Sequence, residues 1–247
     1  MRGERLDERV VREGLAASRS AAQALILAGR VLVDDEPVDK SGTRIGVERS
    51  IRLKGGTRRF VSRGGEKLAA ALADLRLDPS GMRCLDVGAS TGGFTDCLLQ
   101  QGAERVVAID VGHSQIHSSL RLDPRVEVRE RVNARHLGPD DFDERFELVV
   151  VDVSFISLEL ILPALHSCAP AAEFLLLVKP QFEVGRDQVG KGGVVRDDAL
   201  RKAAANRVAD AACALGRREK GRVESRLPGP KGNREIFVWI SAGEVED

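Results

Sequence analysis

Apolar runs alternate with helical patterns from residue 82 onward. Five of these runs are rich in aliphatic and β-branched residues: RCLDVGA, VVAIDV, VEVRE, LVVVDVSF and EFLLLVKP. Continuous apolar runs of this length are typical of strands covered on both faces, as in a parallel sheet with crossover helices. Residues 197–216 then predict a long amphipathic helix, and VESRL and EIFVWI predict two closing strands. The body of the chain is therefore predicted to be a doubly wound α/β domain.

The first sixty residues predict two short helices and a small sheet. LDERVVREGL has apolar residues at helical spacing, with its arginines largely on the other face. Ser20–Gln23 fits a capping box and Gly29 a helix stop, which together frame a second helix. RVLV and Pro37–Val38 flank the acidic turn DDE, so a strand is expected to turn back on itself here. This pattern indicates a small N-terminal α+β domain.

A segment rich in glycine and arginine separates these two patterns. Residues 55–66 read GGTRRFVSRGGE, a composition expected of a linker rather than of a packed element. We therefore predict an N-terminal domain over residues 1–58, a linker over residues 59–66 and a second domain over residues 67–247.

The formal net charge is zero, but the charge is unevenly distributed. Residues 1–67 contain 15 Lys+Arg and 10 Asp+Glu, which gives a net charge of +5, so the remainder of the chain carries −5. A basic end joined to an acidic body suggests that the short end binds a polyanion such as nucleic acid. The alternative is that these charges only solvate a surface.

Composition also limits the location and the chemistry. The chain is 43% apolar, and it has no run approaching the roughly 20 apolar residues of a membrane-spanning helix. No apolar run follows the charged N-terminus, so a signal peptide is not expected and the cytoplasm is the predicted location. The cysteines lack metal-binding spacing, so we expect reduced, mostly buried thiols and no metal site. They are Cys84, Cys97, Cys168 and Cys213.

A glycine-rich turn follows the first strand of the α/β body. RCLDVGA leads into STGGFT at the start of a helix. Turns of this kind, at the carboxyl ends of strands, bind nucleoside cofactors. A dinucleotide fingerprint would need glycine at 88, 90 and 93, but residue 90 is serine, and Asp86 would repel a pyrophosphate. A tight turn with no ligand is the remaining alternative.

The pattern Asp86-x-Gly88-x-Ser90-x-Gly92 resembles the first motif of class I methyltransferases, which use S-adenosyl-L-methionine. A carboxylate suits the ammonium and sulfonium of that cofactor. Asp110, at the end of the next strand, is placed to accept hydrogen bonds from the cofactor ribose, and Asn133 matches the position that usually contacts the adenine. The predicted cofactor-binding residues are Asp86, Gly88, Ser90, Thr91, Gly92, Gly93, Phe94, Asp110 and Asn133.

Opposite charges end two of the apolar strands. Asp152 lies in VVVDVSF and Lys179 in LLLVKPQFE. Because burying a lone charge is costly, we expect the two to pair, either in a functional site or in a salt bridge that supports the sheet. Together with Lys67 in SRGGEKL and Glu235 in NREIFVW, they resemble the Lys-Asp-Lys-Glu catalytic tetrad of FtsJ-type ribose 2′-O-methyltransferases.

The same motifs, together with DVGASTGGFTD and DVSFISL, resemble the TlyA family, in which an FtsJ-like domain is joined to an S-four-type RNA-binding domain. The resemblance implies an α/β fold with a Rossmann-like class I methyltransferase sheet and 2′-O-methylation of cytidine in ribosomal RNA. A ribose hydroxyl is a poor nucleophile until its proton is withdrawn. We expect Lys179 to act as the general base or to stabilise the developing alkoxide, with Lys67 nearby and both carboxylates orienting the lysines.

The segment LDERVVREGLAASRSAAQALILAGRVLVDDEPV resembles the S-four-type module. The resemblance implies contact with structured RNA, and the candidate residues are Arg5, Arg9, Arg19 and Arg30. The glycine-rich loop 181–196 has the length of a lid or substrate loop. In this loop Arg186, Lys191 and Arg196 are further candidates for phosphate contacts, although exposure to solvent alone would explain any one of them.

Two departures from the TlyA pattern affect the interpretation. His113 stands where relatives commonly have an aromatic residue, and the chain ends soon after EIFVWI without an extra C-terminal helix. The second departure favours large-subunit ribosomal RNA as the substrate, with the small subunit as a further possibility. Other hypotheses are a catalytically inactive ribosome-associated RNA-binding factor, a membrane-active haemolysin and a small-molecule methyltransferase.

Overall fold

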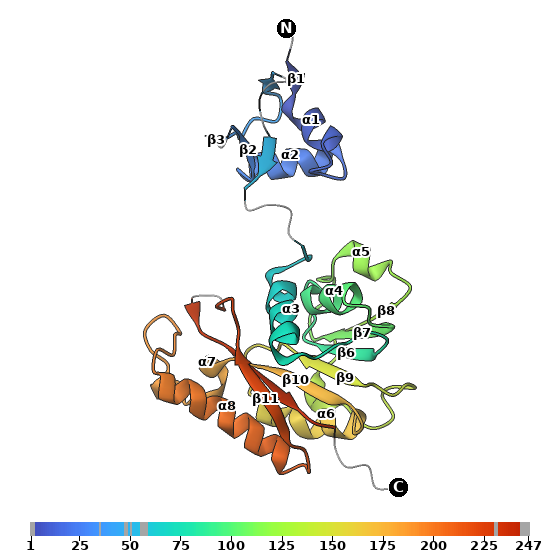
Figure 1. The fold of residues 1–247 in the computed structure, drawn as a ribbon, viewed down its shortest axis with the longest axis vertical. Coiled ribbons are helices and arrows are strands. Elements are labelled where there is room, and N and C mark those ends of the chain that lie inside the picture. The colour runs from blue at the N-terminus through green and yellow to red at the C-terminus, as the bar shows by residue number, and fades with distance from the viewer. Residues whose placement is uncertain are drawn as a thin grey trace. The chain divides into compact units, whose positions relative to one another are not determined.

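The computed structural model divides the chain into two units, Met1–Arg59 and Phe60–Asp247 (Figure 1). It describes residues 3–34, 36–46, 49, 51–54, 59–229 and 232–242. Each unit has its own hydrophobic core, and each is considered by itself below.

The N-terminal unit packs two helices against short strands. Leu6, Val10, Ile26, Val31 and Ile45 are among the residues of its core. β2 pairs antiparallel with β3 and with β5, and β1 pairs antiparallel with β4, so the predicted return of a strand on itself is present. The elements are β1 (Glu4–Arg5), α1 (Leu6–Arg12), α2 (Arg19–Leu27), β2 (Val31–Val33), β3 (Glu36–Pro37), β4 (Arg44–Ile45) and β5 (Ile51–Leu53).

The N-cap of the second helix lies two residues before the predicted one. Ser18, not Ser20, is the N-cap residue, and its hydroxyl accepts a hydrogen bond from the backbone N–H of Ala21 at 3.2 Å. Both serines precede a residue that can supply this N–H, so the sequence alone did not distinguish them.

The larger unit contains a seven-stranded sheet in the order β11-β12-β10-β9-β6-β7-β8. The five strands from β6 to β10 are parallel, and β12 runs antiparallel to both β10 and β11. This sheet confirms the predicted Rossmann-like α/β class. The strands are β6 (Arg83–Val87), β7 (Arg105–Asp110), β8 (Val126–Glu130), β9 (Leu148–Val151), β10 (Glu173–Val178), β11 (Glu219–Glu224) and β12 (Ile236–Ile240).

Helices cover both faces of this sheet, which explains why its central strands are apolar throughout. Residues of α3 and α4 share one core with alternate strand positions such as Val150 and Leu175, whereas residues of α6 and α8 share the other core with Val149 and Leu176 (Figure 1). The helical elements are α3 (Arg63–Leu75), α4 (Gly93–Gln100), α5 (Ser118–Arg121), η1 (Ala134–His136), η2 (Leu158–Leu160), α6 (Leu162–Cys168), α7 (Pro180–Glu183), η3 (Arg186–Gln188) and α8 (Asp198–Cys213).

Two predicted boundaries differ from the structure. The linker expected over residues 59–66 includes the buried Phe60 and the first turn of α3, which begins at Arg63; residues 55–58 lie outside the described part. The strand expected at VESRL lies earlier, at Glu219–Glu224, where every second residue is exposed. This edge strand is largely polar, so it lacks the apolar run used to find the others.

The sheet brings the site residues to one edge. Parallel strands β6, β7, β9 and β10 all end there. Because β12 is antiparallel and Ile236 pairs with Val178, Glu235 at the start of β12 lies at the same edge as Lys179 at the end of β10. Residues that are 56 positions apart in the chain, 179 and 235, are thereby brought together.

In the part of the chain that the structure covers, no helix combines the length and the apolar character needed to cross a membrane.

Candidate active site

The turn between β6 and α4 lies tightly against the end of β9. Gly88 has φ +84°, and a Cβ atom built on it would lie 2.5 Å from the carbonyl oxygen of Asp152. The backbone N–H of Ser90 donates to Asp110 Oδ2 at 2.8 Å, and that of Gly112 donates to Asp110 Oδ1 at 2.6 Å. The glycine turn therefore joins the ends of β6, β7 and β9 in one surface.

Two cavities open at this edge of the sheet. The first has a volume of about 580 Å³, and Lys67, Asp152, Lys179 and Glu235 all line it. The second has a volume of about 1230 Å³, and Asp110 and Asn133 line it. The cavities share a wall, which consists of Gly88, Ser90, Asp152, Ser154, Phe155, Gln181 and Phe182.

Most of the predicted cofactor residues face these cavities. Gly88 and Ser90 line both, and Thr91, Gly93 and Phe94 line the first. Gly92 and Asp86 are among the lining residues of neither cavity.

Asp86 lies beneath the turn and not at its surface. Its side chain is fully buried, and Oδ2 accepts hydrogen bonds from the backbone N–H and the hydroxyl of Thr95, at 2.9 and 2.6 Å. Burial raises the pKa of Asp86 to about 7, and the hydrogen bonds from Thr95 act in the opposite direction. The expectation that Asp86 faces the cofactor is therefore corrected: Asp86 fixes the first turn of α4 in place.

The four residues of the predicted tetrad form two ion pairs. Lys67 Nζ donates to Glu235 Oε2 at 2.5 Å, and Lys179 Nζ lies 2.6 Å from Asp152 Oδ1. Lys179 Nζ also donates to the hydroxyl of Ser154 at 2.9 Å. Among the described residues, the second oxygen of Glu235 has no hydrogen-bond partner although it is buried. Because both pairs line an open cavity, they differ from a salt bridge that only supports the sheet.

An aromatic pair, in which Phe155 is exposed and Phe182 is half-buried, forms part of the wall between the cavities. Phe155 is 90% exposed and has φ +67°, and its ring centroid lies 5.1 Å from that of Phe182. An exposed aromatic face can stack on a nucleobase. Both residues stand in motifs, DVSFISL and VKPQFE, of which only the charged residues Asp152 and Lys179 were predicted to be functional. The sequence feature that could have identified them is a phenylalanine shortly after the end of each apolar strand.

Glu183 connects the two segments that carry this pair. Its Oε2 accepts from the hydroxyl of Ser157 at 2.6 Å, and Oε1 accepts from the backbone N–H of Leu158 at 3.0 Å. Burial raises the pKa of the Glu183 carboxyl above its ordinary value. Glu183 thus holds the loop after β9 against α7, and these segments supply Asp152 and Lys179 respectively.

Asn233 holds the glycine-rich loop beside Glu235. Its side chain is buried, accepts from the backbone N–H of Val195 at 2.9 Å and donates to the carbonyl of Gly193 at 2.8 Å. Gly193 and Val189 line the first cavity, so the loop forms one of its walls. Lys191 and Arg196 are exposed, and the side chain of Arg186 lies outside the described part of the structure.

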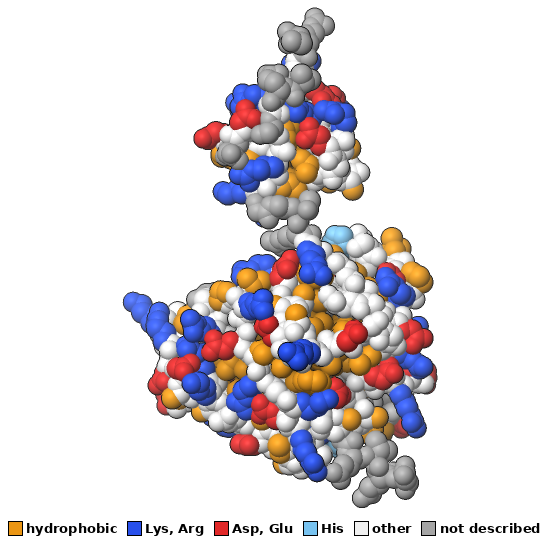
Figure 2. Space-filling model, in the orientation of Figure 1, with side chains coloured by type: hydrophobic (Ala, Val, Ile, Leu, Met, Phe, Trp, Pro, Cys, Tyr) orange, Lys and Arg blue, Asp and Glu red, His pale blue; other side chains and the backbone are white. Residues whose placement is uncertain are grey.

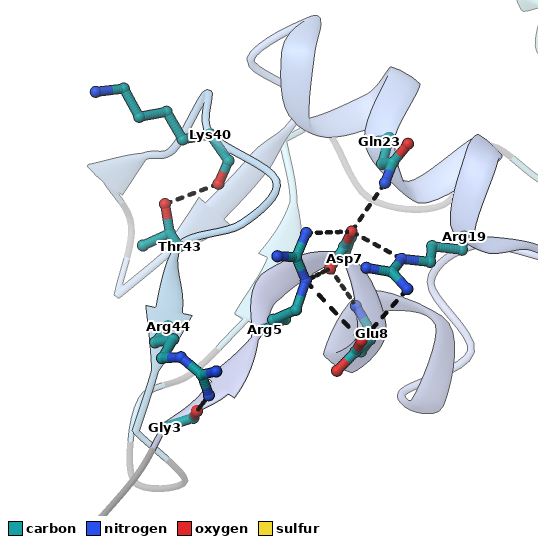
Figure 3. A network of polar contacts seen from close by, with 9 residues as sticks. All are labelled: Gly3, Arg5, Asp7, Glu8, Arg19, Gln23, Lys40, Thr43 and Arg44. Carbon is teal, nitrogen blue, oxygen red and sulfur yellow. Dashed lines mark hydrogen bonds and ion pairs between the residues drawn. The ribbon is translucent and has the colours of Figure 1, made fainter.

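The predicted RNA-binding arginines differ in their surroundings. Arg9 is buried and donates to Glu13 Oε1 at 2.8 Å and to the carbonyls of Gly46 and Arg49 at 2.5 and 2.7 Å. Arg9 therefore connects α1 to the segment after β4 and is not an outward-facing residue as predicted. Arg30 is half-buried, and its Nε has no hydrogen-bond partner among the described residues. Arg5 and Arg19 both contact Asp7 (Figure 3).

His113 and the cysteines lie outside the two cavities. The His113 side chain is exposed, and its Nδ1 lies 2.6 Å from Glu130 Oε2. The cysteines are all free thiols, of which only Cys213 is exposed. No group of three or more potential metal ligands from His, Cys, Asp and Glu occurs within the residues that the structure describes.

The chain is similar to known proteins over nearly its whole length. The FtsJ-like methyltransferase family model matches residues 60–242, and the S4 domain model matches residues 4–51. The chain is 50% identical over 238 residues to the 16S/23S rRNA (cytidine-2'-O)-methyltransferase TlyA of Mycobacterium tuberculosis, covering 96% of this chain and 89% of that protein. It is 43% identical over 236 residues to Hemolysin A of Brachyspira hyodysenteriae, covering 95% and 98% of the two chains.

A solved structure of a candidate hemolysin from Streptococcus thermophilus is 41% identical, with a TM-score of 0.75, and the match covers 99% of this chain and 90% of that one. The Rossmann-like sheet and the match to the FtsJ-like family model identify the larger unit as a class I methyltransferase. The chain belongs to the FtsJ-like methyltransferase family and, with its S4 domain, to the TlyA family within it. The predicted family, fold and enzyme class are confirmed.

The raised pKa of Asp86 predicts a pH-dependent stability difference. A carboxyl whose folded pKa, about 7, exceeds its ordinary value of 3.8 stabilises the fold at low pH, and this contribution is lost as the pH rises from about 4 to 7. Relative to Asp86→Asn, the wild type should therefore lose stability over this range, at about 1.4 kcal/mol for each unit of pKa shift. Urea unfolding at several pH values measures the difference, and a pH-independent difference would contradict the assignment.

The contacts of Glu183 predict that Glu183→Ala lowers methyltransferase activity, up to about 100-fold, because the loop carrying Asp152 is no longer held against α7. Glu183→Gln should retain more activity, since its carbonyl can accept from Leu158 and its amide can donate to Ser157. Single-turnover rates of both variants, measured with saturating cofactor, provide the comparison. Equal rates for the alanine variant and the wild type would exclude the role.

Proposed function

We propose that the protein transfers a methyl group from S-adenosyl-L-methionine to the ribose 2′-hydroxyl of a cytidine in ribosomal RNA. The observation that carries this proposal is that the Lys67–Glu235 and Lys179–Asp152 pairs line one cavity. The TlyA relative with this substrate in its name is 50% identical over almost the whole chain.

The second cavity suits the nucleoside part of the cofactor. Asp110 presents a carboxylate at its rim, where it can accept hydrogen bonds from ribose hydroxyls, and Asn133 lies in the same cavity. A Cβ atom at Gly88 would collide with the carbonyl of Asp152, so glycine allows the turn to pack against the end of β9 at the edge where both cavities open. A cofactor that extends past Gly88 and Ser90 would reach the first cavity, because these residues line both.

In this proposal the four charged residues act on the ribose hydroxyl. The bound cofactor supplies an electrophilic methyl group on a positively charged sulfur. Lys179 Nζ accepts the proton of the 2′-oxygen if it reacts as the neutral amine, or stabilises the negative charge that develops on that oxygen if it reacts as the ammonium, while Asp152 and Ser154 hold the Lys179 side chain in one position. Lys67, held by Glu235, places a second ammonium in the same cavity. Alignment of the reactants contributes about 7 to 11 kcal/mol in such reactions, so we expect it to lower the reaction barrier more than proton transfer to Lys179 does.

RNA recognition is assigned to both parts of the chain. The S4 domain lies in the basic end, where residues 1–67 carry a net charge of +5. In the methyltransferase domain, Phe155 and Phe182 offer a stacking surface for the base of the target nucleotide. We place the S4 domain within residues 1–58 and the methyltransferase domain after it, and we assign the enzyme to the cytoplasm.

Lys179→Ala should abolish methyl transfer, with a loss of at least about 10²- to 10⁴-fold, because it removes the general base or the stabilising charge. Binding of S-adenosyl-L-methionine, measured by calorimetry, should survive. The assay uses labelled cofactor and separated ribosomal subunits, and the modified ribose is mapped by reverse-transcription stops.

Lys202→Ala is the matched control, because Lys202 is an exposed residue of α8 paired with Asp198. This variant should retain full activity. Turnover retained by Lys179→Ala would remove Lys179 from the mechanism. A wild type that binds the cofactor and RNA but transfers no methyl group would favour the inactive RNA-binding factor instead.

A further inference from the structure

Asp7 is a buried carboxylate at the centre of a network in the N-terminal unit (Figure 3). Arg5 donates from Nε to Oδ1 and from Nη2 to Oδ2, both at 3.0 Å. Oδ2 also accepts from Arg19 Nε at 3.0 Å and from Gln23 Nε2 at 2.9 Å. Arg5 precedes α1, whereas Arg19 and Gln23 belong to α2, so Asp7 gathers three side chains from two segments.

The network is buried at its centre and open at its edge. The Asp7 side chain has no exposed surface, whereas the side chains of Arg5 and Arg19 are 34% and 53% exposed. A Cβ atom at Gly42 would lie 3.3 Å from Arg5 Nη1, so the backbone of this glycine lies against one side of the guanidinium. Arg5 and Arg19 are therefore held in defined positions while part of each guanidinium remains accessible to a ligand.

Holding an arginine in one rotamer favours binding. A free arginine side chain loses conformational entropy when it binds a phosphate, and a side chain already fixed by the fold loses less. The planar guanidinium can hydrogen-bond a carboxylate with one edge and a phosphate with another. Lys40 and Arg44, both exposed, lie on the adjoining segment, where Arg44 donates to the carbonyl of Gly3 and the Lys40 side chain points away from the network (Figure 3).

We propose that Asp7 is a positioning residue for RNA binding, which holds Arg5 and Arg19 side by side so that both contact the phosphate backbone. This inference rests on the proposed function, in which the S4 domain binds ribosomal RNA. Asp7 acts through the two arginines and does not touch the RNA.

A positioning role and a simple charge effect predict opposite changes in RNA affinity for Asp7→Asn. Asp7→Asn removes a negative charge, so an effect of charge alone would tighten binding to a polyanion. If Asp7 positions the arginines, the same substitution weakens binding, because the amide nitrogen of asparagine cannot accept their N–H groups. Basic and acidic side chains are interspersed on the visible face of the unit, so the overall charge is only one part of recognition (Figure 2).

Glu8 provides the matched control on the same helix. It carries the same charge and lies next to Asp7, but its side chain is 47% exposed, and its contacts to Arg5 and Arg19 are longer, at 3.9 and 3.5 Å. Glu8→Gln therefore removes one negative charge without removing the shared carboxylate.

The experiment measures binding of the full chain to an in vitro transcript of bacterial 23S ribosomal RNA at several salt concentrations. Asp7→Asn should raise the dissociation constant roughly three- to tenfold and reduce the salt dependence, as expected when a phosphate contact is lost. Glu8→Gln should bind as tightly as the wild type or more tightly. Calorimetric binding of S-adenosyl-L-methionine should be unchanged in both variants, which reports that the methyltransferase domain is intact.

Asp7→Asn that binds RNA as tightly as the wild type, or more tightly, would overturn the inference while leaving the proposed function in place. Failure of the wild type itself to bind the transcript would reject RNA binding by the protein, and the inference with it.

Arg5→Lys tests the same idea if Asp7→Asn does not fold. This variant keeps the positive charge but cannot make the two parallel hydrogen bonds to Asp7. It should bind RNA several-fold more weakly than the wild type, and wild-type affinity would again overturn the inference. Where Asp7→Asn folds, adding it to an Arg5→Ala, Arg19→Ala background should cause no further loss. If Asp7→Asn weakened RNA binding as much in this background as in the wild type, Asp7 would not act through Arg5 and Arg19.

Discussion

A buried ammonium group needs a carboxylate partner, and this requirement organises the active site. Lys67 and Lys179 are both buried, and each contacts a carboxylate from a different part of the chain. Removing one member of such a pair leaves an uncompensated buried charge, which costs several kcal/mol. The pairs thus depend on the register of the sheet, because β12 must pair with β10 for Glu235 to reach the edge where Lys179 lies. The positions of these four side chains at one edge of the sheet therefore follow from its strand order.

The N-terminal unit uses the same principle for another purpose. Here the buried partner is the carboxylate of Asp7, and the guanidinium groups around it are partly exposed. In the methyltransferase domain, by contrast, both members of the Lys67–Glu235 pair are buried beside a cavity. Charge pairing thus encloses both charges of a pair in one unit and leaves the cationic partners partly exposed in the other.

The parallel sheet and the charges at Asp152 and Lys179 could be predicted from local signals in the sequence, whereas Lys67 and Glu235 came only from the resemblance to the FtsJ-type tetrad. Apolar strands end in single charges at Asp152 and Lys179, and periodicity reveals this directly. The direction in which a side chain points leaves a weaker signal. Asp86 stands in a cofactor-like motif but turns inward to Thr95, and Arg9 lies on a helix face that the segment after β4 covers. Both side-chain directions depend on tertiary contacts, which the spacing of residues along the chain does not reveal. The hydrogen bonds that Glu183 accepts from Ser157 and Leu158 were not predicted for the same reason, since these partners lie more than 20 residues away in the chain.

The common wall of the two cavities has a thermodynamic consequence. Asp152, Ser154, Phe155, Gln181 and Phe182 border both spaces, so a molecule in either space rests on the same side chains. When one occupant orders these side chains, the other encounters a surface that has already lost its freedom. With methyl donor and acceptor in these two spaces, as proposed, their affinities would be coupled, and the coupling would be reciprocal: any factor by which the donor changes the affinity for the acceptor is the factor by which the acceptor changes the affinity for the donor.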